Sequence, residues 1–157
     1  MPLLNDLRNI QGDLHYAHQG QVVRWKDLSC LYHDTLYTLN GKASQWAKPR
    51  VRSSVSSAQI NAFGDFSLAD DNLIIHQMKA SGAGSSLAGT GTISLKDMTS
   101  PRGTLHNSFT LSLEDLSQSK LLQKTALSQI PIQGTLEGTA RINGPLKAPS
   151  LWDVTLS

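Results

Sequence analysis

The last twenty-eight residues of the chain, residues 130–157 (IPIQGTLEGTARINGPLKAPSLWDVTLS), contain the pattern that decides the fold. Apolar and polar positions alternate through this stretch, the alternation stops at Gly144-Pro145, and a new alternating run begins after Pro149. Side chains in a β-strand point to opposite faces in turn, so a period of two predicts a strand. The stretch therefore predicts a strand, a tight link and a second strand, with no helix between them.

The same alternation is clearest in residues 105–113. Leu105, Phe109, Leu111 and Leu113 fall on one face of the expected strand, and hydroxyl side chains and His106 fall on the other. Residues 87–95 continue the pattern, except that Gly89 and Gly91 stand where inward side chains are expected. Glycine inside a strand marks a bulge, a bend or a close backbone approach, so we expect curvature at these two positions.

Further strands are predicted over residues 9–16, 21–32, 35–44, 51–60, 65–69 and 72–80, separated by links rich in Gly, Asn and Asp. Only residues 114–128 look different. Asp115 or Ser117 can cap a short helix there, with leucines along one side, and we expect this helix near residues 115–128. The fold class predicted is mainly β, an elongated, curved and half-open antiparallel sheet with one short helix.

Composition narrows the classes of function. The chain has 157 residues, a net charge of +2, only 17% charged residues and a single cysteine, Cys30. The basic residues are scattered without interleaved aromatics, which argues against a nucleic-acid partner. One cysteine allows neither an internal disulfide framework nor a thiolate metal site.

No segment of the sequence has the roughly 20 apolar residues needed to cross a bilayer, and no signal peptide is recognisable. The abrupt ends of the chain, the last inside an expected strand, suggest a single segment, residues 1–157, of a longer repetitive protein. A weak internal repeat supports this: Val23, Trp25, Leu28 and Gly41 match Leu73, Ile75, Met78 and Gly91 at an offset of about fifty residues.

The stretch GTARINGPLKAPSLWDVTLS, residues 138–157, resembles the repeat of the AsmA-like superfamily, which includes the TamB proteins. In that repeat a strand of the form G-x-a-x-i-x-G precedes an L-x-x-P-x-L segment. Gly138, Ile142, Gly144, Leu146, Pro149 and Leu151 occupy those positions. Residues 111–117 (LSLEDLS) and 134–138 (GTLEG) also resemble elements of these proteins. The matching motifs therefore cover about the last fifty residues, and the rest of the chain resembles the family only in its general strand pattern.

The resemblance implies a function. AsmA-like and TamB-like proteins of Gram-negative bacteria are anchored in the inner membrane and cross the periplasm as a taco-shaped β-sheet with an apolar inner face. They are associated with phospholipid transport between the two membranes, and TamB also with the assembly of outer-membrane proteins; a plant relative lies in the chloroplast envelope. The chain would then be a non-enzymatic segment of such a protein. Its partners would be phospholipid acyl chains and outer-membrane assembly proteins.

An apolar sheet face is physically suited to this task. An acyl chain crossing water exposes about a dozen methylenes at about 0.8 kcal/mol each, so apolar contact must offset on the order of 10 kcal/mol. Nine strands spaced by about 4.8 Å would give a wall roughly 40 Å long. The residues expected to line the groove are mostly aliphatic: Val23, Trp25, Leu73, Ile75, Leu87, Ile93, Leu95, Phe109, Leu111, Leu113, Leu136 and Ile142.

Alternating apolar residues also build the core of a closed sandwich, so a sandwich that binds carbohydrate or protein is the alternative. For carbohydrate, Trp46 in a polar segment is the exposed anchor expected, whereas Trp25 and Trp152 are expected to point inward. A third alternative is a module that pairs its open edge strands with another chain.

The other groups of polar residues in the sequence do not indicate a catalytic or metal-binding site. His15 and His18 are three residues apart, and such positions point to opposite faces of a strand, so they cannot chelate a metal there without a turn. The pairs Asp70-Asp71 and Glu114-Asp115 fall at expected turn or cap positions rather than converging on one substrate atom. We therefore expect no catalytic residues, no metal site and no cofactor.

Overall fold

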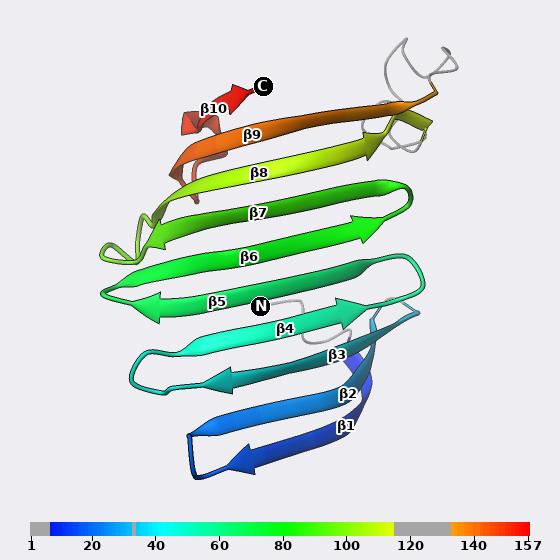
Figure 1. The fold of residues 1–157 in the computed structure, drawn as a ribbon, viewed down its shortest axis with the longest axis vertical. Coiled ribbons are helices and arrows are strands. Elements are labelled where there is room, and N and C mark those ends of the chain that lie inside the picture. The colour runs from blue at the N-terminus through cyan, green and yellow to red at the C-terminus, as the bar shows by residue number, and fades with distance from the viewer. Residues whose placement is uncertain (1–6, 33, 115–132) are drawn as a thin grey trace.

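The structure is a computed structural model that describes residues 7–32, 34–114 and 133–157. These residues form one ten-stranded antiparallel sheet in which the strands follow one another in chain order (Figure 1). The strands are β1 (Leu7–Ala17), β2 (Val22–Tyr32), β3 (Thr35–Ser44), β4 (Arg50–Ser56), β5 (Asn61–Ala69), β6 (Asn72–Gly82), β7 (Ser85–Ser94), β8 (Arg102–Ser112), β9 (Thr135–Pro145) and β10 (Asp153–Leu156).

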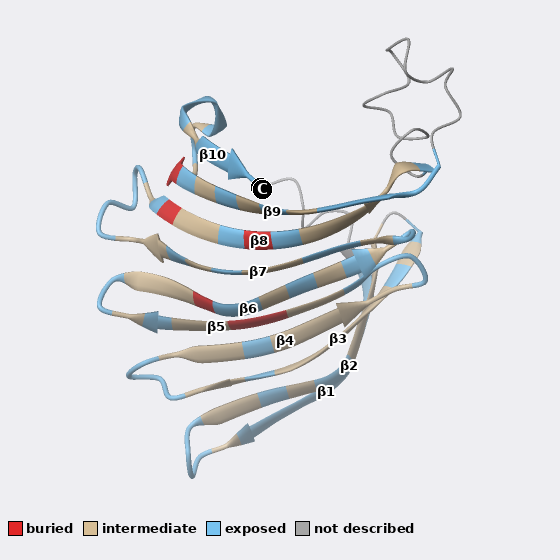
Figure 2. Ribbon diagram, turned by 45° about the horizontal axis from the view of Figure 1, so that its top comes forward, coloured by how far each residue is buried: buried red, intermediate tan, exposed pale blue. Residues whose placement is uncertain are grey.

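The sheet is open. β1 and β10 lie at its opposite edges and do not pair with each other, and Figure 2 shows the strands bowed along their length. This confirms the mainly β, open antiparallel sheet predicted from the alternation of the sequence. The short helix expected near residues 115–128 lies outside the described residues.

One bulge interrupts the pairing of β2 with β3. Trp25 pairs with Gly41 and Leu28 pairs with Leu39, so β2 carries one more residue than β3 across this step. The extra residue is accommodated at Asp27, whose backbone has a φ of 51°. A bulge of this kind bends its strand and increases the local twist.

β6 has the same irregularity fifty residues later. Ile75 pairs with Gly91 and Met78 pairs with Gly89, so β6 again advances three residues where β7 advances two. The expected irregularity at Gly89 and Gly91 therefore lies on the neighbouring strand, while β7 itself pairs with β8 without a break.

The strand predicted over residues 51–60 was wrong at its end. β4 stops at Ser56, and a turn leads to β5, which begins at Asn61 rather than at Asp65. Ser57 makes the turn, because its Oγ accepts hydrogen bonds from the N–H groups of Gln59 and Ile60 at 3.2 and 3.1 Å. A serine hydroxyl that bonds nearby backbone in this way competes with the strand ladder.

The C-terminal stretch forms the predicted strand, link and strand. β9 continues through Gly144 to Pro145, a 3-10 turn η3 (Pro149–Leu151) follows, and β10 pairs with β9. The indole N–H of Trp152 donates to the Pro145 carbonyl at 2.8 Å and closes the link. Among the described residues, no helix is long and apolar enough to span a membrane.

The described residues lack a packed core. Ile75, with 6% of its surface exposed, is the one buried hydrophobic residue among them. Closed sandwiches bury the inner faces of two sheets against each other. The structure has a single layer instead, so the closed sandwich is not the architecture of the described residues.

Candidate functional site: the apolar face of the sheet

One face of the sheet is apolar from edge to edge. Paired residues of antiparallel strands point to the same side, so the register defines rows of side chains across the sheet. One such row joins β1 to β10: Tyr16, Val23, Ala43, Val51, Phe66, Ile75, Gly91, Leu105, Ile142 and Val154. We call the side that carries this row the apolar face.

Ten of the twelve residues expected to line a groove lie within strands and on the apolar face, by register and alternation. They are Val23, Trp25, Leu73, Ile75, Leu87, Ile93, Phe109, Leu111, Leu136 and Ile142. Leu95 and Leu113 lie one residue beyond β7 and β8, where their N–H groups donate to the carbonyls of Asp71 and Gly134. The structure therefore brings the predicted set together on one surface.

Several residues of this surface were missed. Phe66, Leu39 and Val55 also face this side, as does Leu105, which the alternation had identified without placing it in the groove. The signal was present in residues 37–43, where Tyr37, Leu39, Gly41 and Ala43 alternate with polar residues, and in Val51 and Val55, which are four residues apart. The turn at Ser57 hid this signal. With residues 51–60 taken as one strand, the pairing of Val55 with Ala62 across the turn cannot be recognised.

Glycines give this face an unusual surface, because large side chains of the adjacent strand lie over them. A Cβ added to Gly41 would be 2.5 Å from Cζ2 of Trp25, and one added to Gly91 would be 2.6 Å from Cδ2 of Leu105. These distances are far below van der Waals contact. The side chains thus lean across the backbone of the next strand and cover it with hydrocarbon.

The same arrangement recurs near the C-terminal edge. A Cβ on Gly138 would be 2.8 Å from Cζ of Phe109, and one on Gly144 would be 2.9 Å from Cδ1 of Trp152. Trp152 is thus directed onto the sheet, as expected. The result is a low, mainly apolar surface rather than a layer of side chains that stand up to interdigitate with a second sheet.

Much of this surface is in contact with solvent. Leu87 is 38% exposed, Ile60 46% and Leu136 48%. Scattered exposed leucines are normal on proteins, but a contiguous apolar patch marks a binding surface or an interface. In the described residues no other part of the chain covers it.

A hollow of about 880 Å³ opens on the apolar face, between the turn after β4 and strand β8. Ile60, Leu87, Phe109 and Leu111 provide its large side chains, and Ala80 and Gly82 lie among them. This volume is within the range of about 300–1,000 Å³ that is typical of sites for small organic ligands. Three residues predicted from sequence to line the groove therefore meet in one concavity.

Polar side chains such as Ser53 and Asn107 interrupt the apolar face. Asn107 lies between Gly89 and Ala140 in the register and is only 8% exposed. Its Oδ1 lies over Gly89, close enough to exclude a Cβ there, and is buried without a hydrogen-bond partner among the described residues. Sequence alternation places Asn107 inward, but gives no reason for an amide at this position.

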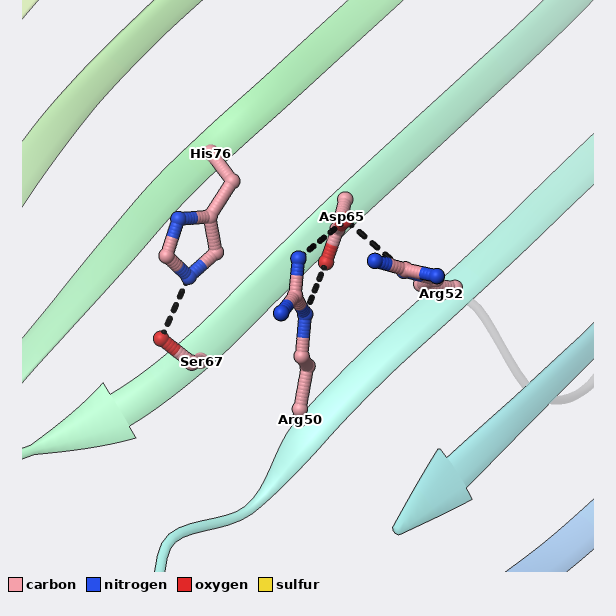
Figure 3. Close-up of polar contacts among 5 residues, drawn as sticks. All are labelled: Arg50, Arg52, Asp65, Ser67 and His76. Carbon is pink, nitrogen blue, oxygen red and sulfur yellow. Dashed lines mark hydrogen bonds and ion pairs between the residues drawn. The ribbon is translucent and has the colours of Figure 1, made fainter.

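The opposite face carries most of the charged side chains of the strands, together with a few apolar ones such as Leu36, Phe63 and Ile74. Asp65, 7% exposed, accepts hydrogen bonds from Arg50 and Arg52 of β4, and Ser67 and His76 bond to each other at 2.7 Å (Figure 3). The bonds from Arg50, with those from Arg52, lower the pKa of Asp65 to about 2 against the opposing effect of burial. This carboxylate is therefore ionised throughout the physiological range.

The remaining candidates from the sequence do not gather into a site. His15 lies in β1 and His18 in the following turn, where its ring makes an edge contact with Tyr16. Asp70 and Asp71 form the turn between β5 and β6, both with positive φ. In the described part of the chain no three His, Cys, Asp or Glu side chains come together as metal ligands would.

Trp46 is exposed, as expected for a single aromatic anchor. It lies in the loop between β3 and β4, where half of its surface is in solvent. Neither Trp25 nor Trp152 is near enough in the register to form a stacking platform with it, because both lie over glycines of the apolar face. This arrangement gives no support to a carbohydrate platform of several aromatics.

Comparison of the chain with protein-family models, curated proteins and solved structures finds no match in any of the three. The AsmA-like resemblance of residues 138–157 therefore stays a prediction. The apolar face itself is the feature of the molecule that points to a function.

Proposed function

We propose that this chain is a non-enzymatic segment of a cell-envelope protein of AsmA-like, TamB-type architecture, and that its apolar face carries phospholipid acyl chains between the inner and outer membranes. The parent protein would be anchored in the inner membrane, and this segment would lie in the periplasm. The observation that carries the proposal is a ten-stranded open sheet whose apolar face has no second layer among the described residues.

The energetics favour a hydrocarbon occupant. Transfer of a dozen methylenes from water to an apolar surface is worth on the order of 10 kcal/mol, and removing the exposed leucines from water adds to this. Most side chains that lie flat over glycines on this face are hydrocarbon, so few polar groups would fix one position. Such a surface lets an acyl chain move along the rows, as transport requires.

The width of the sheet also fits a lipid. Ten strands at about 4.8 Å spacing give a face roughly 40 Å across, longer than one acyl chain. The hollow at Leu87, Phe109 and Leu111 gives a tail a place to enter. Outer-membrane assembly proteins remain part of the proposal as partners of the parent protein, through the sheet edges rather than this face.

Photo-crosslinking tests the proposal with matched controls from adjacent residues. A benzophenone amino acid at Leu111 or Ile93 faces the apolar side, whereas the same probe at Thr110 or Thr92 faces the polar side of the same strand. In cells that make the chain with its natural flanking sequence, phospholipid adducts are expected at Leu111 and Ile93 only. Equal adducts at all four positions, or adducts to protein alone at Leu111, would count against lipid transport on this face.

A further inference from the structure

The polar face carries an unusual concentration of positive charge at one end of β1 to β4. Arg24, Lys42, Lys48, Arg50 and Arg52 lie within two residues of the ends of these strands, or in the loop that joins β3 to β4. The turn after β1 and the loop after β3 are on the same side of the sheet, at the left of the view (Figure 1). We call these five residues the basic corner.

The register sets like charges opposite one another in this corner. Arg24 pairs with Lys42, and Lys42 pairs with Arg52. Directly opposite side chains have Cβ atoms about 4.5–5.5 Å apart, and like charges in that position destabilise a sheet. A sheet that needed only stability would alternate acids with the basic residues of this row.

Few acids offset the corner. Asp65 ends the row and is already bonded to Arg50 and Arg52, while Asp13 pairs with Lys26 beside it. Asp70 and Asp71 lie in the next turn along the sheet and limit the corner on that side. Arg24 and Lys42 are exposed and have no ion-pair partner among the described residues.

An exposed tryptophan stands at the tip of the same corner. Trp46 is half exposed and lies in the loop with Lys48, whose N–H donates to the Gln45 carbonyl at 2.8 Å. Tryptophan concentrates at membrane interfaces, where its ring meets hydrocarbon and its N–H meets water. Lys and Arg near a membrane are attracted to anionic headgroups.

From this combination we infer that the basic corner docks the sheet onto a membrane surface of anionic phospholipid, with Trp46 entering the headgroup region. Nucleic acid fits less well, because no second aromatic on the polar face of β1 to β4 lies beside the basic row to stack with bases. Headgroups also move laterally and can gather beneath cations of any spacing. The inference does not depend on what the apolar face binds.

Vesicle flotation of the chain tests this. Vesicles of phosphatidylcholine with about a third phosphatidylglycerol should bind it at low salt and release it at high salt, because screening removes the attraction. Vesicles of phosphatidylcholine alone should bind it weakly. Strong binding to both would assign the contact to the apolar face and overturn the inference.

Charge variants locate the contact. Each basic residue near an anionic surface is worth about fivefold in partitioning, so Arg24→Gln with Lys42→Gln should weaken binding about thirtyfold. The matched control, Lys79→Gln with Arg141→Gln, removes the same charge from β6 and β9 on the same face and should retain binding. Equal losses in the two double variants would mean a response to net charge alone, against a local corner.

Fluorescence and competition complete the test. Anionic vesicles should shift the tryptophan emission of the unmodified chain to the blue, and Trp46→Phe should abolish this shift while Trp25 and Trp152 continue to report the fold. A shift that survives in Trp46→Phe would exclude insertion of this loop. Stronger binding to duplex DNA than to anionic vesicles in one buffer would replace the membrane with nucleic acid as the partner.

Discussion

Arg50 and Asp65 form a two-bond ion pair between β4 and β5. Nε of Arg50 donates to Oδ1 of Asp65 and Nη2 donates to Oδ2, both at 2.8 Å (Figure 3). Nε of Arg52 donates to Oδ2 at the same distance. The side chain of Asp65 is 9% exposed, against 38% and 45% for the two arginines. One carboxylate therefore holds two guanidinium groups at the edge of the basic corner.

Replacing this carboxylate should destabilise the sheet. Asp65→Asn leaves Arg50 and Arg52 next to Lys42 without an opposing charge, and we expect a loss of about 1–3 kcal/mol in the free energy of unfolding at neutral pH. Denaturation in urea, followed by circular dichroism, measures this loss. Asp13→Asn, which removes an exposed carboxylate opposite Lys26, should cost less. An Asp65→Asn variant as stable as the unmodified chain would show that the pair contributes nothing net.

The same pair predicts a dependence on pH. The pKa of Asp65 is lowered to about 2, below its value in the unfolded chain, so the folded state favours the ionised carboxylate. Its contribution is present above the unfolded pKa of about 4 and is lost as the pH falls toward 2. The stability difference between the unmodified chain and Asp65→Asn should therefore shrink over this interval. A difference that stays constant from pH 6 to about pH 2 would contradict the assignment.

Gly91 should resist any side chain. An added Cβ would lie 2.5 Å from the Thr104 carbonyl oxygen and 2.6 Å from Cδ2 of Leu105. Because the first of these atoms belongs to the backbone of β8, it cannot move without disturbing the pairing of the two strands. We expect Gly91→Ala to cost about 1–3 kcal/mol, measured as a lower melting temperature. Thr90→Ala, on the other face of the same strand, is the control and should cost less than half as much.

The sequence predicts strands well in this protein because a period of two is a local property. Residues 105–113 show it without interruption, and β8 occupies nearly the same range. The apolar face follows from the same alternation, which is why ten of the twelve expected lining residues share it. Residue types that are common in turns do not by themselves show where a strand ends. Asn72 begins a strand, and Gly41 lies inside β3.

Relations between strands could not be predicted in this way. The opposition of Arg24, Lys42 and Arg52 depends on the register of three strands, which the bulge in β2 shifts by one residue. The end of β4 depends on hydrogen bonds to one hydroxyl, that of Ser57. The covering of glycines by neighbouring side chains likewise requires the pairing partner to be known. Alternation specifies the two faces, whereas register specifies the sites on them.

Asn40 should stabilise the bulge in β2. Its Oδ1 accepts a hydrogen bond at 2.8 Å from the N–H of Asp27, the residue with positive φ. Asn40→Ala removes this acceptor, so we expect a loss of about 0.5–1.5 kcal/mol and faster amide exchange at Asp27 by NMR. Asn40→Asp keeps an acceptor oxygen and should restore protection of this amide. Equal exchange rates in all three proteins would show that the bulge does not need the side chain.

Asn107 offers a change that should stabilise the sheet. Its Oδ1 is buried over Gly89 and has no hydrogen-bond partner in the described part of the chain, and such an acceptor costs about 1–3 kcal/mol. One row away, Leu105 covers Gly91 in the same manner, so a leucine side chain fits over a glycine on this face. We therefore expect Asn107→Leu to raise the melting temperature, whereas Asn107→Ala, which uncovers Gly89, should raise it less or lower it. A lower melting temperature for Asn107→Leu would show that the buried amide is not a net cost to the stability of the sheet.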